Sequence, residues 1–293
     1  MHAFSLALLV FAASPVLPSK AALGTWQLLY TVTGKDQWLT AVWPRKEGAW
    51  FAGGKNVLVV GKDATATVRE LPQTVLYKFG EDSAMRVIAV GSGARVWEQD
   101  GDDLRLVHET TSAPRSGRAA YGDILYGIGY LDPSSAETLM AYGPNDLIAY
   151  RPAGGAWETK RDSSLATRAQ IGPPDVHLPP KCQRLSWRWF TRDQGFLACQ
   201  NGDSYLMSGG GPQPTGRLPS ACRIELYALA RDGEHIFASC GNGQTLWVGT
   251  LASRSWTSVE GAPRGGRGLA VGNGCLMAVT ERKVWRRCAS ASK

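Results

Sequence analysis

The chain has 293 residues, of which 44% are hydrophobic and 19% charged, with 34 glycines and 16 prolines. This composition supports a buried core and excludes an intrinsically disordered chain. The formal net charge is +7, and it falls to about +6 if Lys20 is removed with a leader. A moderate basic excess serves solubility or attracts an acidic partner, such as an acidic protein or an anionic polysaccharide.

The N-terminus has the pattern of a secretory signal peptide. Residues 4–16 form an apolar run that is too short to span a bilayer comfortably, and the small residues Ser19 and Ala21 follow it. We therefore expect a leader at residues 1–22, a single domain at 23–293, no transmembrane segment after leader removal, and export to the periplasm or beyond. Because residues 1–3 carry no Lys or Arg, an uncleaved N-terminal anchor is the alternative.

After the leader, the chain reads as short strands rich in β-branched and aromatic residues, separated by Gly, Pro and Asp. No segment shows sustained helical periodicity. In chain order we expect strands at residues 24–32; 38–43, 49–52, 56–60 and 65–71; 75–79, 85–90, 95–98 and 104–108; 124–128, 138–142, 147–150 and 156–160; 184–190, 196–199, 204–207 and 217–218; 224–229, 236–239, 245–248 and 256–259; 268–271, 276–279 and 283–286.

An internal repeat organises these strands. A small residue within an apolar run recurs about six times, at Ala52, Ala89, Ala141, Ala198, Ser239 and Ala278, in steps of 37, 52, 57, 41 and 39 residues. Four-stranded units at such spacing predict an all-β fold, a β-propeller. We expect six four-stranded blades, with five or seven as alternatives. The last unit has only three strands, so the N-terminal strand is expected to join the last blade and close the ring, which removes an open sheet edge.

The six cysteines all lie in the last three repeats, and an even number in an exported chain predicts disulfides. Cys275 and Cys288 flank a hairpin almost symmetrically and are expected to pair. Cys182 and Cys199 lie at one end of a hairpin in repeat four, as do Cys222 and Cys240 in repeat five, but their pairing stays open. There is no Cys-x-x-Cys spacing and few histidines, so neither a zinc site nor any cofactor is expected.

Two insertions between repeats, at residues 110–122 and 161–181, should lie over one face because both connect an outer strand to the next inner strand. Long loops on a rigid scaffold often carry function, although they can also be disordered inserts. Basic residues gather in these loops and on the strand that follows. The candidate binding residues are Arg115, Arg118, Arg161, Arg168, His177 and Lys181, with Arg184 and Arg188 nearer the central channel.

Arg188 lies in a run where Trp187 and Trp189 alternate with arginines. A period of two places the two tryptophans on one face of the strand and the arginines on the other. The tryptophans then pack between sheets, or they are exposed and suit sugar stacking, while the arginines suit carboxylates or sulfates.

Residues 49–58, with the closing Gly-x-Trp pieces at Trp26 and Trp157, resemble the BNR-like propellers, including the assembly-factor type of photosynthetic organisms. The resemblance implies a propeller fold. The Asp-box Ser-x-Asp-x-Gly-x-Thr-Trp of that group is absent throughout, and no local motif assigns the arginine cluster, Tyr/Glu pair and Asp of related sialidases. The resemblance therefore carries over the fold alone.

Motifs for catalysis and nucleic-acid binding are weak. No Gly-x-Ser-x-Gly occurs. The acidic turn from Glu98 through Asp100 to Asp103 fits turn geometry better than a calcium site. The isolated piece at residues 264–268 resembles an RNA-binding RGG motif but is better explained as a basic loop, so no nucleic-acid partner is expected. We expect a binding or scaffold protein without enzymatic activity that presents a basic loop face to a protein or anionic glycan. The alternative is a glycan-acting enzyme of the glycosidase or lyase kind.

Overall fold

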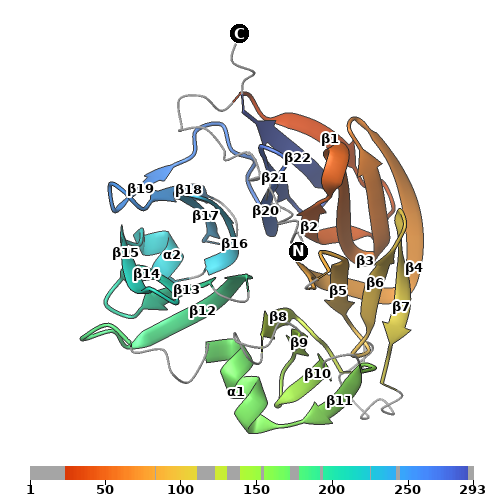
Figure 1. Ribbon diagram of the computed structural model, residues 1–293. Helices are drawn as coiled ribbons and strands as arrows, with labels where there is room; N and C mark the ends of the chain where they lie inside the picture. The colour runs from red at the N-terminus through yellow and green to blue at the C-terminus, as the bar shows by residue number, and fades with distance from the viewer. Residues whose placement is uncertain are drawn as a thin grey trace, which may run out of the picture.

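The computed structural model describes residues 24–82, 84–110, 123–130, 139–152, 155–171, 178–191, 194–224, 226–241 and 245–289. The expected leader at 1–22 and all but the first residue of the 110–122 insertion lie outside these ranges. The described strands form five antiparallel sheets, four with four strands and one with six. Figure 1 shows the sheets arranged as a ring around a common axis. The expectation of an all-β fold is confirmed.

In each four-stranded sheet the strands are arranged from the centre of the ring outwards in the order given below. The six-stranded sheet holds β2 (Trp38–Pro44), β3 (Ala49–Lys62), β4 (Thr65–Glu81), β5 (Val87–Gly91), β6 (Val96–Asp100) and β7 (Asp103–His108). In this sheet, by contrast, both β2 and the last part of β4 are inner strands. The four-stranded sheets hold β8 (Gly127–Tyr130), β9 (Leu139–Tyr142), β10 (Leu147–Arg151) and β11 (Glu158–Arg161); β12 (Arg184–Thr191), β13 (Gln194–Cys199), β14 (Asp203–Ser208) and β15 (Gly211–Arg217); β16 (Leu226–Asp232), β17 (His235–Cys240), β18 (Thr245–Thr250) and β19 (Ser255–Ser258); and β20 (Gly268–Gly272), β21 (Cys275–Val279), β22 (Lys283–Cys288) and β1 (Gln27–Thr31).

The expectation of six separate four-stranded sheets is wrong, because the first two repeats share one sheet. The long strand β4 pairs with β3 through its first part, Thr65 to Leu71, and with β5 through its last part, Leu76 to Glu81. Residues 72–74, among which Gln73 has a φ of 58°, join these two parts within β4, and Val75 still pairs with Lys55 of β3. β3 likewise runs through the turn expected at residues 53–56, where Asn56 has a φ of 57°. Six sequence repeats thus give five sheets.

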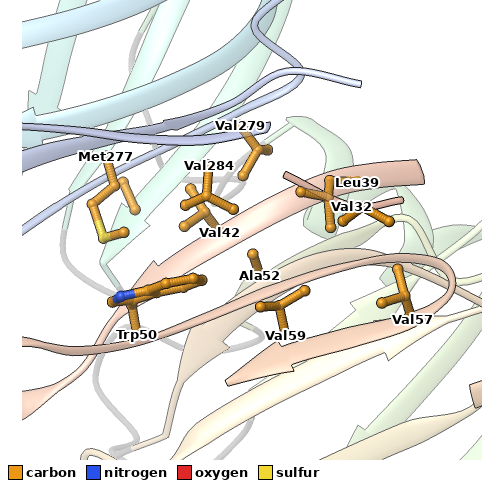
Figure 2. Close-up of a cluster of buried hydrophobic side chains, with 11 residues drawn as sticks. Val32, Leu39, Val42, Trp50, Ala52, Val57, Val59, Met277, Val279 and Val284 are labelled. Atoms are coloured by element: carbon orange, nitrogen blue, oxygen red, sulfur yellow. The ribbon is translucent and has the colours of Figure 1, made fainter. Parts of the chain in front are cut away.

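The recurring small residue of the repeat is buried in the core in every repeat. All six positions, Ala52 to Ala278, are buried, with at most 2% of the residue exposed. Figure 2 shows Ala52 with Val42, Trp50 and Met277 in the core cluster between the first and last sheets. A larger side chain at these positions would push neighbouring sheets apart, because protein interiors have little free volume. The small residues that recur in the sequence therefore correspond to positions where neighbouring sheets pack against each other.

Glycine follows two positions after the small residue in the first three repeats, at Gly54, Gly91 and Gly143. A Cβ at any of them would overlap a backbone carbonyl oxygen of the adjacent inner segment, that of Trp38 for Gly54 and of Val75 for Gly91. Glycine is required there because only a residue without a side chain permits such a close backbone approach. The glycines that could suggest a nucleotide loop in sequence thus have a packing role.

The two ends of the described chain share one sheet. β1 pairs antiparallel with β22, with Gln27 opposite Arg286 and Thr31 opposite Lys283. The amide of Gly24 donates a 2.9 Å hydrogen bond to the carbonyl oxygen of Cys288 and extends this pairing. Figure 1 shows β1 beside β22 at the edge of the last sheet. The N-terminal strand thus supplies the fourth strand that the last repeat lacks.

Three disulfides link cysteines within the second half of the chain. Cys275 and Cys288 face each other across the β21–β22 pair, with Cα atoms 3.9 Å apart, as the sequence predicts. The two pairs that the sequence left open are Cys182–Cys199, with Cα atoms 5.2 Å apart, and Cys222–Cys240, with Cα atoms 4.6 Å apart. Each links the second strand of its sheet to the segment around the first strand.

Two short helices interrupt the all-β pattern and were not expected from the sequence. Helix α1 (Ser163–Ile171) occupies the start of the 161–181 insertion, and α2 (Ser220–Ile224) precedes β16. The carboxylate of Asp162 caps α1 by accepting hydrogen bonds from the amides of Ser164 and Leu165, both 3.1 Å. A 3-10 turn, η2 (Lys46–Gly48), joins β2 to β3. No helix of the described chain is long and apolar enough to cross a membrane.

Candidate functional site

Because neighbouring strands are antiparallel, the connections of every sheet alternate between two faces of the ring. We call the loop face the one that carries the connections between sheets, such as residues 161–184 and 259–268, and the β21–β22 turn at 280–283. We call the turn face the opposite one, which carries the inner hairpin turns at residues 44–49, 232–235 and 272–275. Of the two insertions expected over one face, the described residues 161–171 and 178–181 belong to the loop face.

The three predicted binding residues with described side chains lie on the loop face or inside the ring. Arg161 ends β11, where its guanidinium donates to Asp123 at 2.8 Å and to the carbonyl oxygen of Asn145 at 2.7 Å. Lys181 is exposed beside the first disulfide cysteine. Arg188 is exposed on the inner strand β12. Arg161 therefore anchors its own loop, whereas the ammonium of Lys181 faces solvent.

The other predicted residues stay untested. Arg115, Arg118 and His177 lie outside the described residues. Arg168 is in α1 and Arg184 begins β12, so their backbones are placed, but their side chains are outside the described set. Whether these residues join Arg188 in one site is therefore a proposal.

Arg188 is accompanied by two side chains that sequence reasoning missed, Lys78 from β4 and Tyr142 from β9. Burial raises the pKa of the Tyr142 phenol, and the charge of Arg188 partly opposes that rise; the same charge adds to burial in lowering the pKa of Lys78. Both groups therefore lie within electrostatic reach of Arg188. Tyr142 is on the second strand of its sheet and pairs with Gly127 of the inner strand β8. Because Gly127 has no side chain, the Tyr142 ring occupies the space that a Cβ at residue 127 would need. The phenol thereby extends over the innermost strand. The alternation of inner-strand residues could have indicated Lys78, but nothing local indicates Tyr142.

Burial and the neighbouring Arg188 lower the pKa of the Lys78 ammonium from 10.5 to about 8. Lys78 forms no ion pair with any carboxylate of the described chain. Arg188 Nη1 donates to the carbonyl oxygen of Trp187 at 3.2 Å, and it too lacks a described carboxylate partner. Two like charges without a counter-ion make this part of the ring favourable for an anion.

The alternation around Arg188 is confirmed. Trp187 is buried, with 2% exposed, and its ring lies edge-on to that of Trp189, with centroids 5.3 Å apart. Both residues belong to or pack against one hydrophobic cluster. The indoles therefore pack within the protein, whereas Arg188 between them in sequence is exposed.

A shallow concavity of about 550 Å³ on the loop face adds a second basic feature. Arg264, Arg282 and Lys283 line it beside Trp285, and the Lys283 ammonium lies 5.8 Å from the indole centroid. The one acid in the lining, Glu281, is paired at 3.7 Å with a neighbouring arginine. The loop containing Arg264 is thus a basic connection between sheets, as expected.

The acidic turn considered for catalysis or calcium has a structural role at Glu98. This buried carboxylate accepts from the indole of Trp157 at 2.8 Å and is paired with Arg151 and Arg86. Asp82, with a side chain only 1% exposed, completes the network by binding the same two arginines at 2.9 and 2.7 Å. Within the described residues, no group of three or more His, Cys, Asp or Glu side chains could hold a metal ion.

Comparison with known proteins identifies the architecture. Neither a family model nor a curated protein matches the sequence. Similar solved structures include virginiamycin B lyase from Staphylococcus aureus, with a TM-score of 0.62 and 10% identity over 90% of this chain and 99% of that one. They also include the WD40 repeats of RRP9, with a TM-score of 0.61 and 10% identity over 94% of this chain and 100% of that one. The chain is a β-propeller.

At such low identity this likeness shows the fold alone. A third similar structure, U3-55K, has a TM-score of 0.59 at 10% identity over 90% of this chain. The similar structures thus include a lyase and WD40 repeats, and propellers host many unrelated functions. The more specific resemblance to BNR-like propellers is supported by no family model.

Proposed function

We propose that this propeller is an exported binding protein whose basic loop face and central channel engage an anionic partner, either an acidic protein or an anionic glycan. The observation that carries the proposal is the pair Lys78 and Arg188, two cations on different sheets with no carboxylate among their described neighbours. Burial and, to a smaller extent, repulsion by Arg188 lower the pKa of Lys78, and an anionic group placed between the two cations would offset that repulsion. The site therefore favours a carboxylate or a sulfate.

Exposed cations on the loop face add to this preference for an anion. Lys181 and the concavity formed by Arg264, Arg282 and Lys283 add exposed cations, and Trp285 supplies an aromatic surface among them. The predicted residues Arg115, Arg118, Arg168 and His177 of the insertions, with Arg184 at the start of β12, would add to the same positive field. Three disulfides support export, because such bonds persist in oxidising compartments.

Binding to immobilised heparin, polygalacturonate and a highly acidic protein tests the proposal. The double variant Lys78→Met with Arg188→Met should weaken binding of at least one of them about tenfold or more, the value of one charged hydrogen bond. Arg105→Met is the matched control, because Arg105 is an exposed cation on the outer strand β7. Charge reversal of the eight predicted residues together should abolish binding with the fold intact. Unchanged binding in both variants would refute the proposal.

A glycan-acting enzyme is the second candidate, and the observation that favours it is Glu81. Burial raises the pKa of this carboxyl, as a general acid requires. The indole of Trp43 donates to it at 2.9 Å. An assay for new reducing or unsaturated ends on the same glycans, compared with Glu81→Gln, decides between the candidates. Product that disappears in the variant would establish the enzyme.

A further inference from the structure

A cavity opens on the turn face, away from the residues that the sequence indicated. Its volume is about 1230 Å³. The ends of four inner strands contribute Trp43, Glu81, Arg231 and Val271, so the cavity surrounds the mouth of the central channel. It continues outwards between the first part of β4 and the β6–β7 turn. This volume exceeds that of a typical small-molecule pocket and suits an extended ligand.

The wall of this cavity carries both signs of charge in equal number. Six basic and six acidic side chains line it among the described residues. Ion pairs hold the outer wall together, namely Arg45–Asp102 at 3.1 Å, Arg69–Asp103 at 3.2 Å and Lys62–Glu47 at 4.0 Å. The cavity therefore does not select a polyanion, in contrast to the loop face. It offers closely spaced donors and acceptors to a neutral polar ligand.

At the inner end, an acceptor and a donor lie on different sides of the channel mouth. Glu81 accepts from Trp43 through Oε1, and no described residue donates to its Oε2. From across the ring, β16 brings Arg231, whose Nη1 donates to the side chain of Gln194. Hydroxyl groups donate and accept at once, so a polyhydroxylated ligand can satisfy carboxylate and guanidinium groups together.

Met85 at the rim gives a second, independent indication of a ligand. It has a φ of 58°, in the left-handed region that disfavours residues with long side chains, and it is 61% exposed. Glycine or asparagine would suit this turn better. A large apolar side chain held at such a position beside a cavity can cover the apolar face of a bound sugar ring. Val271 and the ring of Trp43, which line the same cavity, can contact such a face as well.

We infer that the turn-face cavity binds a neutral oligosaccharide. A peptide of similar length would need apolar pockets for anchoring side chains, whereas the apolar part of this lining consists mainly of short aliphatic groups such as Val60 and Val87. The balanced charges, the open acceptor at Glu81 and the exposed Met85 fit a chain of hydroxyl-bearing rings with apolar faces. This site is separate from the loop face, and the inference requires no bond cleavage.

Calorimetric titration of the protein with neutral hexasaccharides of cello-, malto-, xylo- and chito- type tests the inference. At least one should bind. Glu81→Gln should weaken that binding about tenfold or more, because a charged hydrogen bond is lost. Met85→Gly should also weaken it while the protein remains at least as stable, because glycine relieves the strained turn. Reduced binding in this variant therefore cannot be attributed to unfolding.

The channel variant Lys78→Met is the control that separates this inference from the proposed function, and it should leave oligosaccharide affinity unchanged. Binding of none of the four sugars would overturn the inference, as would binding that both turn-face variants retain. Selective binding of peptides from a mixed library, lost in Glu81→Gln, would assign the cavity to the other class of ligand and overturn it as well. None of these results depends on whether heparin or an acidic protein binds the loop face.

Discussion

The ring of Tyr142 lies over the Cα of Gly127 on the paired inner strand, in space that any side chain at residue 127 would occupy. A glycine on β8 thus allows a phenol from β9 to extend over the innermost strand. The edge of the Tyr126 ring, with its centroid 5.5 Å from that of Tyr142, supports this position. The placement of a group in the proposed site therefore depends on the absence of a side chain on the next strand.

Gly127→Ala should displace the Tyr142 ring and destabilise the fold. Overpacking a well-filled core typically costs about 1–3 kcal/mol, and the rigid ring cannot move aside as a flexible chain could. Urea denaturation measures the loss, and anion binding in the channel should weaken together with it. Gly209→Ala is the matched control, because a Cβ there meets nothing within 4 Å. Equal stability of the two variants would contradict this packing.

The stability of the protein should rise with pH between about 8 and 10.5 through Lys78. Its pKa is about 8 in the folded state, against an ordinary value of 10.5. In that interval the unfolded chain binds the proton that the folded chain has released, so the free energy of unfolding increases as pH rises. Denaturant titrations of the wild type and Lys78→Met across this range test it. The difference in the free energy of unfolding between the wild type and Lys78→Met should shrink toward pH 10.5. A difference that does not change with pH would contradict a buried, uncompensated ammonium at Lys78.

Removal of Asp82 should be among the most damaging single changes. Burial alone would raise its pKa, but hydrogen bonds from the Arg86 amide and from the guanidinium groups of Arg151 and Arg86 outweigh burial and lower it. Asp82→Ala leaves Arg151 buried with reduced compensation, and breaking a buried pair typically costs about 3–5 kcal/mol. The same stabilisation should be lost in the wild type as pH falls below 3.8, the ordinary value for an aspartate.

Asp103→Ala gives the comparison for Asp82 in the same denaturation experiment. Asp103 also binds an arginine, Arg69, at 3.2 Å, but the two side chains are 49% and 54% exposed. Exposed pairs are worth about 1 kcal/mol or less. Similar losses in the two variants would show that burial of the Asp82 network contributes little.

The three disulfides should appear in nonreducing peptide maps as Cys182–Cys199, Cys222–Cys240 and Cys275–Cys288. Replacing both Cys275 and Cys288 by serine should lower the free energy of unfolding by about 2–3 kcal/mol, the value for a short closed loop. Free thiols at all six positions in protein from an oxidising compartment would contradict both the pairing and the argument for export.

The sequence predicted the repeat, the all-β propeller and the Cys275–Cys288 pair, because each depends on local spacing. A buried small residue such as Ala52 has to recur wherever two sheets meet, so the pattern is visible in the chain. The helix α1 was missed because its nine residues lie in an insertion without a clear apolar face. The shared sheet was missed because no sequence pattern in residues 72–74 predicts that β4 continues through them.

The candidate sites were predicted less completely, because they are assembled across sheets. Arg188 was identified from the sequence, whereas its companion Lys78 lies 110 positions earlier and becomes a neighbour only when the ring forms. The turn-face cavity takes its lining from hairpin turns of distant repeats. Each turn, read alone, needs only its own backbone geometry to explain its residues, so the convergence of Glu81 and Arg231 has no local signature.

The pairing of β1 with β22 has a consequence for how the protein is made. Gln27 and Arg286 are 259 positions apart, yet their side chains are in hydrogen-bond contact. During synthesis β1 has no partner until β22 has emerged, while the sheets between them in the chain can assemble. Closing so long a loop costs little more entropy than closing a shorter one, because that cost grows only with the logarithm of its length. The late pairing of β1 with β22 then completes the last sheet. Separating these two strands would expose the unpaired edge of each.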